Sequence, residues 1–349
     1  MVENKHGGIE LLRLLAMMMV VTLHVLGAGG ILYNVEELSF DYGMVWLWET
    51  SCYGAVNCFA LISGYVGWNK NFKYRKLIKF WLENVILVYM LCIITYVIGW
   101  NQQSLLVQMR DSVVFLHYWY IRSYLGLMII IPVLNAFIQS TSDSVLRNFT
   151  VVSFLFFTGY TLLARNTFEF DLNKGYSILW LALCYVWGGV IAKLKWNTRL
   201  KTCTWIFVFW GGTIGAWLSK IVSEYFVYKI TGQYVENTFW VTYTSPFIVC
   251  ASIGLFCFFS TQYYTLPKNI YVLSKSILGV YVVHYHLGVR GRIISEKWMY
   301  LISEPRVIMY LKLVGGILTI FIVSLCISVI YAKGLGFIKH VLKIQTMKN

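Results

Sequence analysis

The chain has 349 residues, of which 58% are hydrophobic and only 13% are charged, and its formal net charge is +14. Soluble domains carry about a quarter charged residues, so this composition excludes an ordinary water-soluble enzyme and predicts an integral membrane protein. The positive charge does not indicate nucleic-acid binding, because Lys and Arg lie in short connections between apolar runs. No soluble block is left over, so residues 1–349 are expected to form a single membrane domain.

Apolar runs of the length that crosses a bilayer, about 20 residues, recur along the chain. Such long and uniform runs predict helices rather than barrel strands, so the expected fold class is an all-α polytopic bundle of about ten transmembrane helices. The expected spans are Ile9–Gly29, Met44–Trp68, Leu77–Gly99, Tyr118–Ile138, Phe149–Arg165, Gly175–Leu194, Thr202–Glu224, Phe239–Gln262, Ile270–Val289 and Val307–Ala332.

Lys and Arg are concentrated in alternate connections, most densely in residues 69–79 and 193–201. Because basic connections remain in the cytoplasm, this set predicts that both termini are cytoplasmic. The other connections contain most of the acids and are expected outside the cell.

The first span contains three ionisable side chains, Glu10, Arg13 and His24. Arg13 and His24 are about three helical turns apart, so they share one face with a separation of roughly 16 Å along the axis. Guanidinium matches phosphate, and histidine accepts protons near neutral pH. The pair therefore favours a site for a long acyl carrier such as coenzyme A, with His24 as the base. The alternative is that Arg13 contacts lipid headgroups and His24 packs against a polar neighbour.

The second span contains Glu49 a few residues below its outer end, at a depth similar to that of His24. A carboxylate at that level is predicted to orient the imidazole and stabilise its charged form. The alternative is that Glu49 lies at the water interface.

The connection into the third span holds the densest basic cluster, which includes Arg75, Lys76 and Lys79. These residues are predicted to bind the anionic phosphates of a coenzyme, although the positive-inside rule explains such a cluster as well. The cysteines and histidines show no metal-ligand spacing, so no metal is expected.

Polar and aromatic side chains also gather at the expected outer ends of two other spans. Trp119, Tyr120 and Arg122 open the fourth span, and His284 closes the ninth. These four residues are predicted to bind the acceptor substrate. For the aromatic residues, an interfacial belt is the alternative.

Several segments, taken together in this order, resemble the acyltransferase-3 family of bacterial membrane proteins. They are Arg13-x10-His24 with Glu10 three positions earlier, CFALISGYVGW, the basic connection into the third span, HYWYI and SILGVYVVHYH. The match covers most of the chain. One departure is Lys76-x-x-Lys79, where the family often has Arg-x-x-Arg.

The resemblance implies about ten helices in a bacterial plasma membrane, as spans of about 20 residues would allow. It also implies transfer of acetyl or another short acyl group from cytosolic acyl-coenzyme A to a hydroxyl of a surface glycan or lipid-linked sugar. In that reading Arg13 and His24 are essential, and His24 acts either as a base or as a covalent acyl carrier. A transporter or flippase, and a polysaccharide polymerase, are alternatives that coenzyme dependence would separate.

Overall fold

The computed structural model describes residues 6–101, 103–164 and 169–346, with side chains described as far as residue 337. Within these ranges every regular element is a helix, which confirms the predicted all-α class. Arg165, the last residue of the fifth predicted span, lies outside the described residues.

Six helices in the described ranges are long and apolar enough to cross a membrane. They are α1 with its π-helical continuation η1 (Gly7–Leu23 and His24–Ala28), α4 (Arg75–Val97), α6 (Trp119–Ser140), the run α7–η2–α8 (Asp143–Phe154, Leu155–Gly159 and Tyr160–Ala164), α10 (Thr202–Thr231) and α15 (Arg306–Thr346). A seventh span results if the turns Glu169–Asp171 and Asn173–Gly175 count with α9 (Ile178–Leu194), to which they are bent by 78°. The chain is therefore a multi-pass membrane protein.

Three predicted spans differ from single straight helices. The second is divided into α2 (Phe40–Cys52) and α3 (Ala55–Gly67), and the eighth is helical only over α11 (Pro246–Ser260). The ninth consists of α12 (Lys268–Lys275), α13 (Ile277–Tyr285) and α14 (Leu287–Ile293). The connections also contain α5 (Leu105–Val113), η5 (Trp196–Thr198) and η6 (Met299–Ser303).

Close packing explains how these breaks are tolerated. A Cβ on Gly54, at the first break, would stand 2.8 Å from the hydroxyl oxygen of Ser252 on α11. At the break between α12 and α13, the carbonyl oxygen of Ser276 accepts a hydrogen bond of 2.5 Å from Ser328 on α15. Non-helical backbone persists at membrane depth where protein groups satisfy it. At the break between α12 and α13, α15 supplies such a group, and at Gly54 the missing side chain lets α11 approach closely.

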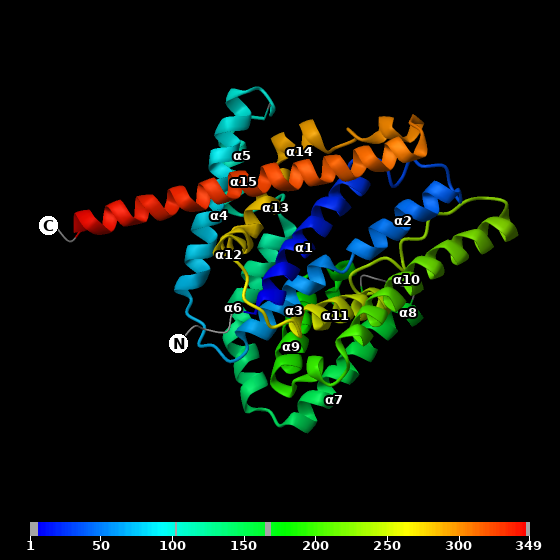
Figure 1. The fold of residues 1–349 in the computed structure, drawn as a ribbon, viewed down its shortest axis with the longest axis horizontal. Helices are drawn as coiled ribbons and strands as arrows, with labels where there is room; N and C mark the ends of the chain where they lie inside the picture. The colour runs from blue at the N-terminus through cyan, green and yellow to red at the C-terminus, as the bar shows by residue number, and fades with distance from the viewer. Residues whose placement is uncertain (1–5, 102, 165–168, 347–349) are drawn as a thin grey trace.

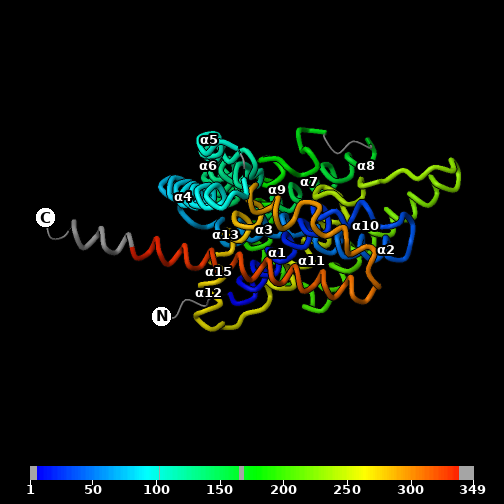
Figure 2. The backbone as a smooth tube through the Cα atoms, turned by 90° about the horizontal axis from the view of Figure 1, so that it is seen from above, coloured from blue at the N-terminus to red at the C-terminus, as the bar shows by residue number. Residues whose placement is uncertain are grey.

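Helix α1 runs through the middle of the bundle, between α3, α11 and α13 (Figure 1). Small residues allow the central helices to approach closely. A Cβ on Gly64 of α3 would lie 1.8 Å from the carbonyl oxygen of Tyr185 on α9, so only glycine fits there. Helix α15 crosses the bundle, and its C-terminal part extends beyond it (Figures 1 and 2).

The connections gather at two opposite ends of the bundle. We call one end the basic end, because the Lys- and Arg-rich connections were predicted to lie there. At this end the Gly7 amide donates to the carbonyl oxygen of Tyr264, and the Thr202 and Thr261 hydroxyls are 3.2 Å apart. At the other end, the far end, Arg306 pairs with Asp41 at 2.7 Å. This grouping agrees with the alternation of connections expected from the sequence, while the assignment of the basic end to the cytoplasm remains a prediction.

Candidate active site

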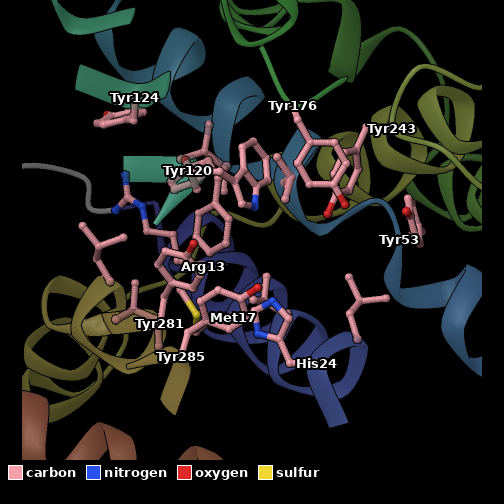
Figure 3. Close-up of a pocket in the computed structure, with 18 of the residues that line it drawn as sticks. Arg13, Met17, His24, Tyr53, Tyr120, Tyr124, Tyr176, Tyr243, Tyr281 and Tyr285 are labelled. Atoms are coloured by element: carbon pink, nitrogen blue, oxygen red, sulfur yellow. The ribbon is translucent and has the colours of Figure 1, made fainter. Parts of the chain in front are cut away.

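A cavity of about 600 Å³ lies between α1, α2, α3, α6 and α13 and extends from the basic end toward the far end. Figure 3 shows Arg13 at one side of this cavity, and His24, Tyr53, Tyr176 and Tyr243 at the other. Arg13 and His24 both line the cavity, so the prediction that they share one face of the first helix is confirmed.

His24 is held by a second histidine. Its Nδ1 lies 2.8 Å from Nε2 of His284, and Nδ1 of His284 lies 2.5 Å from the carbonyl oxygen of Val280. A carbonyl only accepts hydrogen bonds, so Nδ1 of His284 carries a hydrogen and its Nε2 accepts. Nδ1 of His24 must then be the donor, which leaves Nε2 of a neutral His24 with a free lone pair.

Two further features fix the orientation of the His24 ring. The ring stacks on Tyr285 with centroids 4.3 Å apart, and the Arg290 guanidinium lies 4.8 Å from the centre of that tyrosine. His24 also begins the π-helical segment η1, a departure from α-helical geometry that is frequent at functional sites. The His24 ring is therefore held in one orientation, with its free Nε2 on the cavity wall.

His284 does not lie where the sequence prediction put it. The residue is fully buried and is not part of the cavity wall, because it lies against His24. His284 is therefore positioned to orient the His24 ring and not to contact the acceptor. Sequence spacing could not reveal this, since His24 and His284 are far apart in the chain.

Glu49 is 5% exposed and lines the cavity. Its Oε2 is buried and forms no hydrogen bond within the described residues, and no hydrogen bond joins Glu49 to His24. The described residues therefore contain no direct bond by which Glu49 would orient the imidazole, since His284 occupies the Nδ1 side of His24. Glu49 thus lines the cavity and has one oxygen whose hydrogen-bonding capacity no described residue uses.

At the basic end, Arg13 is held by an acid. Its Nη1 lies 2.6 Å from Oε1 of Glu10, whose other oxygen accepts a hydrogen bond from the Ser274 hydroxyl. Lys275 also lines this part of the cavity. Lys275 was not among the predicted site residues, although it directly precedes the SILGVYVVHYH segment.

The other predicted coenzyme contacts lie outside the cavity. Arg75, Lys76 and Lys79 are exposed in the first turns of α4, and Lys79 is 4.0 Å from Glu83. Their neighbour Phe80 does line the cavity. The cluster thus lies on the helix that forms one wall, beyond the residues that form the wall itself.

The predicted acceptor residues on α6 divide into two groups. Trp119 and Tyr120 line the cavity, whereas Arg122 is exposed and does not. The prediction that Arg122 contacts substrate in this cavity is therefore not supported by its position, since it lies on another face of α6.

An aromatic wall closes the far end of the cavity. Trp119 lies 4.4 Å from Tyr176 and 6.0 Å from Tyr243 between ring centroids, and Tyr53 lies 4.8 Å from Tyr243. The three tyrosines come from separate connections and were not among the predicted site residues. Only tertiary packing brings them together, so no local pattern marks them.

A buried amide helps to hold this wall in place. Asn57 is fully buried, and its side-chain nitrogen donates to the carbonyl oxygen of Tyr243 at 2.9 Å. Its side-chain oxygen accepts from Nε1 of Trp180 at 2.9 Å. Fully partnered polar groups of this kind fix a single arrangement of the chain around them.

Two further tyrosines, Tyr281 and Tyr33, line the cavity. Tyr281 is buried, and the Tyr120 backbone lies within hydrogen-bonding reach of its hydroxyl. Burial raises the pKa of Tyr33, in the connection after η1, to about 12, so its hydroxyl keeps its proton at neutral pH. The described residues contain no group of three or more His, Cys, Asp or Glu that could hold a metal ion.

Comparison with known proteins gives one match. A family model described as an acyltransferase domain, Acyl_transf_3, matches residues 6–333. No curated protein and no solved structure matches the chain.

Proposed function

Because the chain belongs to the acyltransferase-3 family of membrane acyltransferases, we propose that it moves acetyl or another short acyl group from acyl-coenzyme A to a hydroxyl of a surface glycan or lipid-linked sugar. The observation that supports this most directly is the His24 ring. Its Nδ1 is committed to His284, so its Nε2 is free on the wall of a 600 Å³ cavity. A general base needs such a nitrogen within reach of the proton that it removes.

The donor enters from the basic end, which we propose to be cytoplasmic. Arg13 and Lys275 line the cavity there, and both bind phosphate oxygens well. The exposed cluster of Arg75, Lys76 and Lys79 at the start of α4 attracts the anionic nucleotide to that end. The roughly 16 Å between Arg13 and His24 along α1 suits a long, narrow carrier arm that brings its thioester to His24.

The chemistry follows from the free nitrogen. His24 Nε2 takes the proton of the acceptor hydroxyl as the oxygen attacks the thioester carbonyl carbon. The new C–O bond forms, the C–S bond breaks, and the proton returns from His24 to the thiolate that leaves. The hydroxyl of Tyr281, a residue that lines the cavity, donates a hydrogen bond to the oxyanion of the tetrahedral intermediate.

The acceptor occupies the far end. Flat aromatic side chains, here Trp119, Tyr176 and Tyr243, pack against the apolar faces of a sugar ring. Glu49, with its free Oε2, accepts a hydrogen bond from a ring hydroxyl. This division of the cavity, cations for the donor and aromatic rings with an acid for the acceptor, suits a bacterial plasma-membrane enzyme that modifies the cell envelope.

The test is acetyl-coenzyme A binding and hydrolysis by purified protein in detergent, with wild type compared to His24→Ala and Arg13→Ala. We expect His24→Ala to lose turnover but retain binding, and Arg13→Ala to bind more weakly. His117→Ala, at an exposed histidine outside the cavity, is the matched control. If the wild type has no affinity for any acyl-coenzyme A, the proposal fails, and transport of a small solute or lipid-linked glycan becomes the better account.

A further inference from the structure

A second hollow lies on the side of the bundle, away from the active site. It has a volume of about 260 Å³ and apolar walls. Val151 of α7 and Trp205 of α10 lie on its two sides, and Trp187 and Ile191 of α9 lie at its base. We call it the lateral groove.

The lateral groove ends among cations at the basic end. Arg147 is exposed and precedes Thr150 and Val151, two groove residues, by three and four positions on α7, so all three share one helical face. Lys201 directly precedes α10, and Trp205, which lines the groove, follows one turn later. Both helices therefore place a cation one turn beyond the apolar walls, at the same end.

Little negative charge opposes these cations. Residues 193–205, which connect α9 to α10, include Lys193, Lys195, Arg199 and Lys201 but no acid. The acid at the start of α7, Asp143, lies 3.8 Å from Lys193. Trp196 lines the groove, and tryptophan is typical of the level of lipid headgroups.

An apolar groove alone does not select one lipid, because bulk acyl chains are as apolar as its walls. Selection must come from the charged end, where a basic pocket between membrane helices favours an anionic headgroup. Arginine contributes a bidentate match to phosphate, and lysine contributes a point charge.

From this juxtaposition we propose that the lateral groove is a binding site for one anionic phospholipid of the surrounding bilayer, whose acyl chain lies between α7 and α10 and whose phosphate contacts Arg147 and Lys201. The site does not overlap the cavity that contains His24, so it is independent of the proposed reaction.

The test is native mass spectrometry of the full-length protein released from detergent after incubation with phosphatidylglycerol or with phosphatidylcholine of the same acyl chains. We expect one phosphatidylglycerol to be retained in preference to phosphatidylcholine. Each cation is worth about 1 kcal/mol near a membrane surface, so Arg147→Gln with Lys201→Gln should reduce retention by about 30-fold. Val151→Trp, which fills the groove at an exposed position, should also reduce it.

The matched control is Lys70→Gln with Lys73→Gln, which removes the same charge from exposed residues at the same end of the bundle. Equal retention of both lipids overturns the proposal, because the lipid would then be merely annular. So does an equal loss of phosphatidylglycerol in the control, which would indicate general surface charge. A dimer that Val151→Trp disrupts would show that the groove accommodates a second copy, and would overturn it too.

Discussion

Two groups of buried polar residues lie in the part of the bundle toward its far end, and their hydrogen bonding differs. In the first, Lys220 and Glu224 on α10 are both fully buried and form an ion pair. Glu224 also accepts hydrogen bonds from the Tyr42 hydroxyl at 2.8 Å and from the Asn237 amide at 2.7 Å. Lys220 lies 3.6 Å from the centre of a Trp46 ring. None of these residues lines the cavity.

The second group is His24, Glu49 and Tyr281, which line the cavity. His24 has one nitrogen bonded and one free, Glu49 Oε2 has no partner within the described residues, and the Tyr281 hydroxyl meets only the backbone of Tyr120. Ionisable residues in a membrane span suggest function by default, yet both groups meet that description. The difference is that the first group has its hydrogen bonds made by protein, whereas the second has capacity left for a ligand.

The ion pair has a structural consequence. Through Asn237 it attaches the connection of residues 232–245 to α10, because Asn237 donates its amide to Glu224 and accepts from Lys220 at 3.3 Å. That connection contains Tyr243, which lines the far end of the cavity. The buried Lys220–Glu224 pair therefore helps to hold in place the cavity wall that faces His24, Glu49 and Tyr281.

The largest effect is expected for His24→Gln, which replaces the free ring nitrogen with an amide that is a very poor base. Acyl transfer should fall by about 10²- to 10⁴-fold, the usual contribution of general acid–base catalysis. The melting temperature in detergent should change little, because Nδ1 of His24 donates only one hydrogen bond, to His284. Transfer assays with labelled acyl-coenzyme A and thermal melts of the same preparation measure both. Retention of most of the activity would remove His24 from the chemical step.

Lys220→Met should, in contrast to His24→Gln, act mainly on the stability of the protein. Removal of one partner leaves Glu224 as an unpaired buried charge, which costs about 3–5 kcal/mol. We therefore expect a clear fall in unfolding free energy, measured by denaturant titration in detergent. The double variant Lys220→Met with Glu224→Leu should recover much of that loss, because it removes the second charge as well. Unchanged stability of the single variant would contradict the structural role assigned to the pair.

The sequence predicted those features of the fold and the site that depend on the length and periodicity of single helices. Long apolar runs identified α1, α4, α6, α10 and α15, and three turns of one helix brought Arg13 and His24 to one face of α1. The breaks in the second and ninth spans could not be predicted, because they depend on contacts between α3 and α11 and between α13 and α15.

The partners of the site residues could not be predicted for the same reason. Whether a buried polar atom is free depends on which distant group reaches it, as His284 reaches His24 while Glu49 does not. The tyrosines at positions 53, 176 and 243 are adjacent only in the fold. Lys220 and Glu224 were inside the seventh predicted span, four residues apart, and this spacing is the sequence signal of an ion pair that could have been used.

A variant of the orienting partner sharpens the comparison. His284→Ala leaves Nδ1 of His24 without an acceptor and allows the other tautomer, so activity should fall by about 10²-fold, at the low end of a base's contribution. His284→Gln supplies a side-chain oxygen that accepts the same hydrogen bond, and should restore part of the rate. The ratio of the two variants in a transfer assay is the measurement. Equal rates would show that His284 acts only through packing.

The smallest effect is expected at Arg13, where the protein already provides a partner. Glu10 pairs with the guanidinium at 2.6 Å and itself accepts a hydrogen bond from Ser274. Some of the hydrogen-bond donors of Arg13 are therefore used by the protein, and the others are available to a ligand in the cavity. Arg13→Lys keeps the charge but loses the bidentate fork, and a charge-assisted hydrogen bond is worth about 1.5–3 kcal/mol. The KM for acyl-coenzyme A should therefore rise by about 10-fold while kcat stays near its original value, since uniform binding is lost. Steady-state kinetics with saturating acceptor measure the two constants separately. A fall in kcat instead would place Arg13 at the reacting atoms, and the separation of donor and chemical ends along α1 would no longer hold.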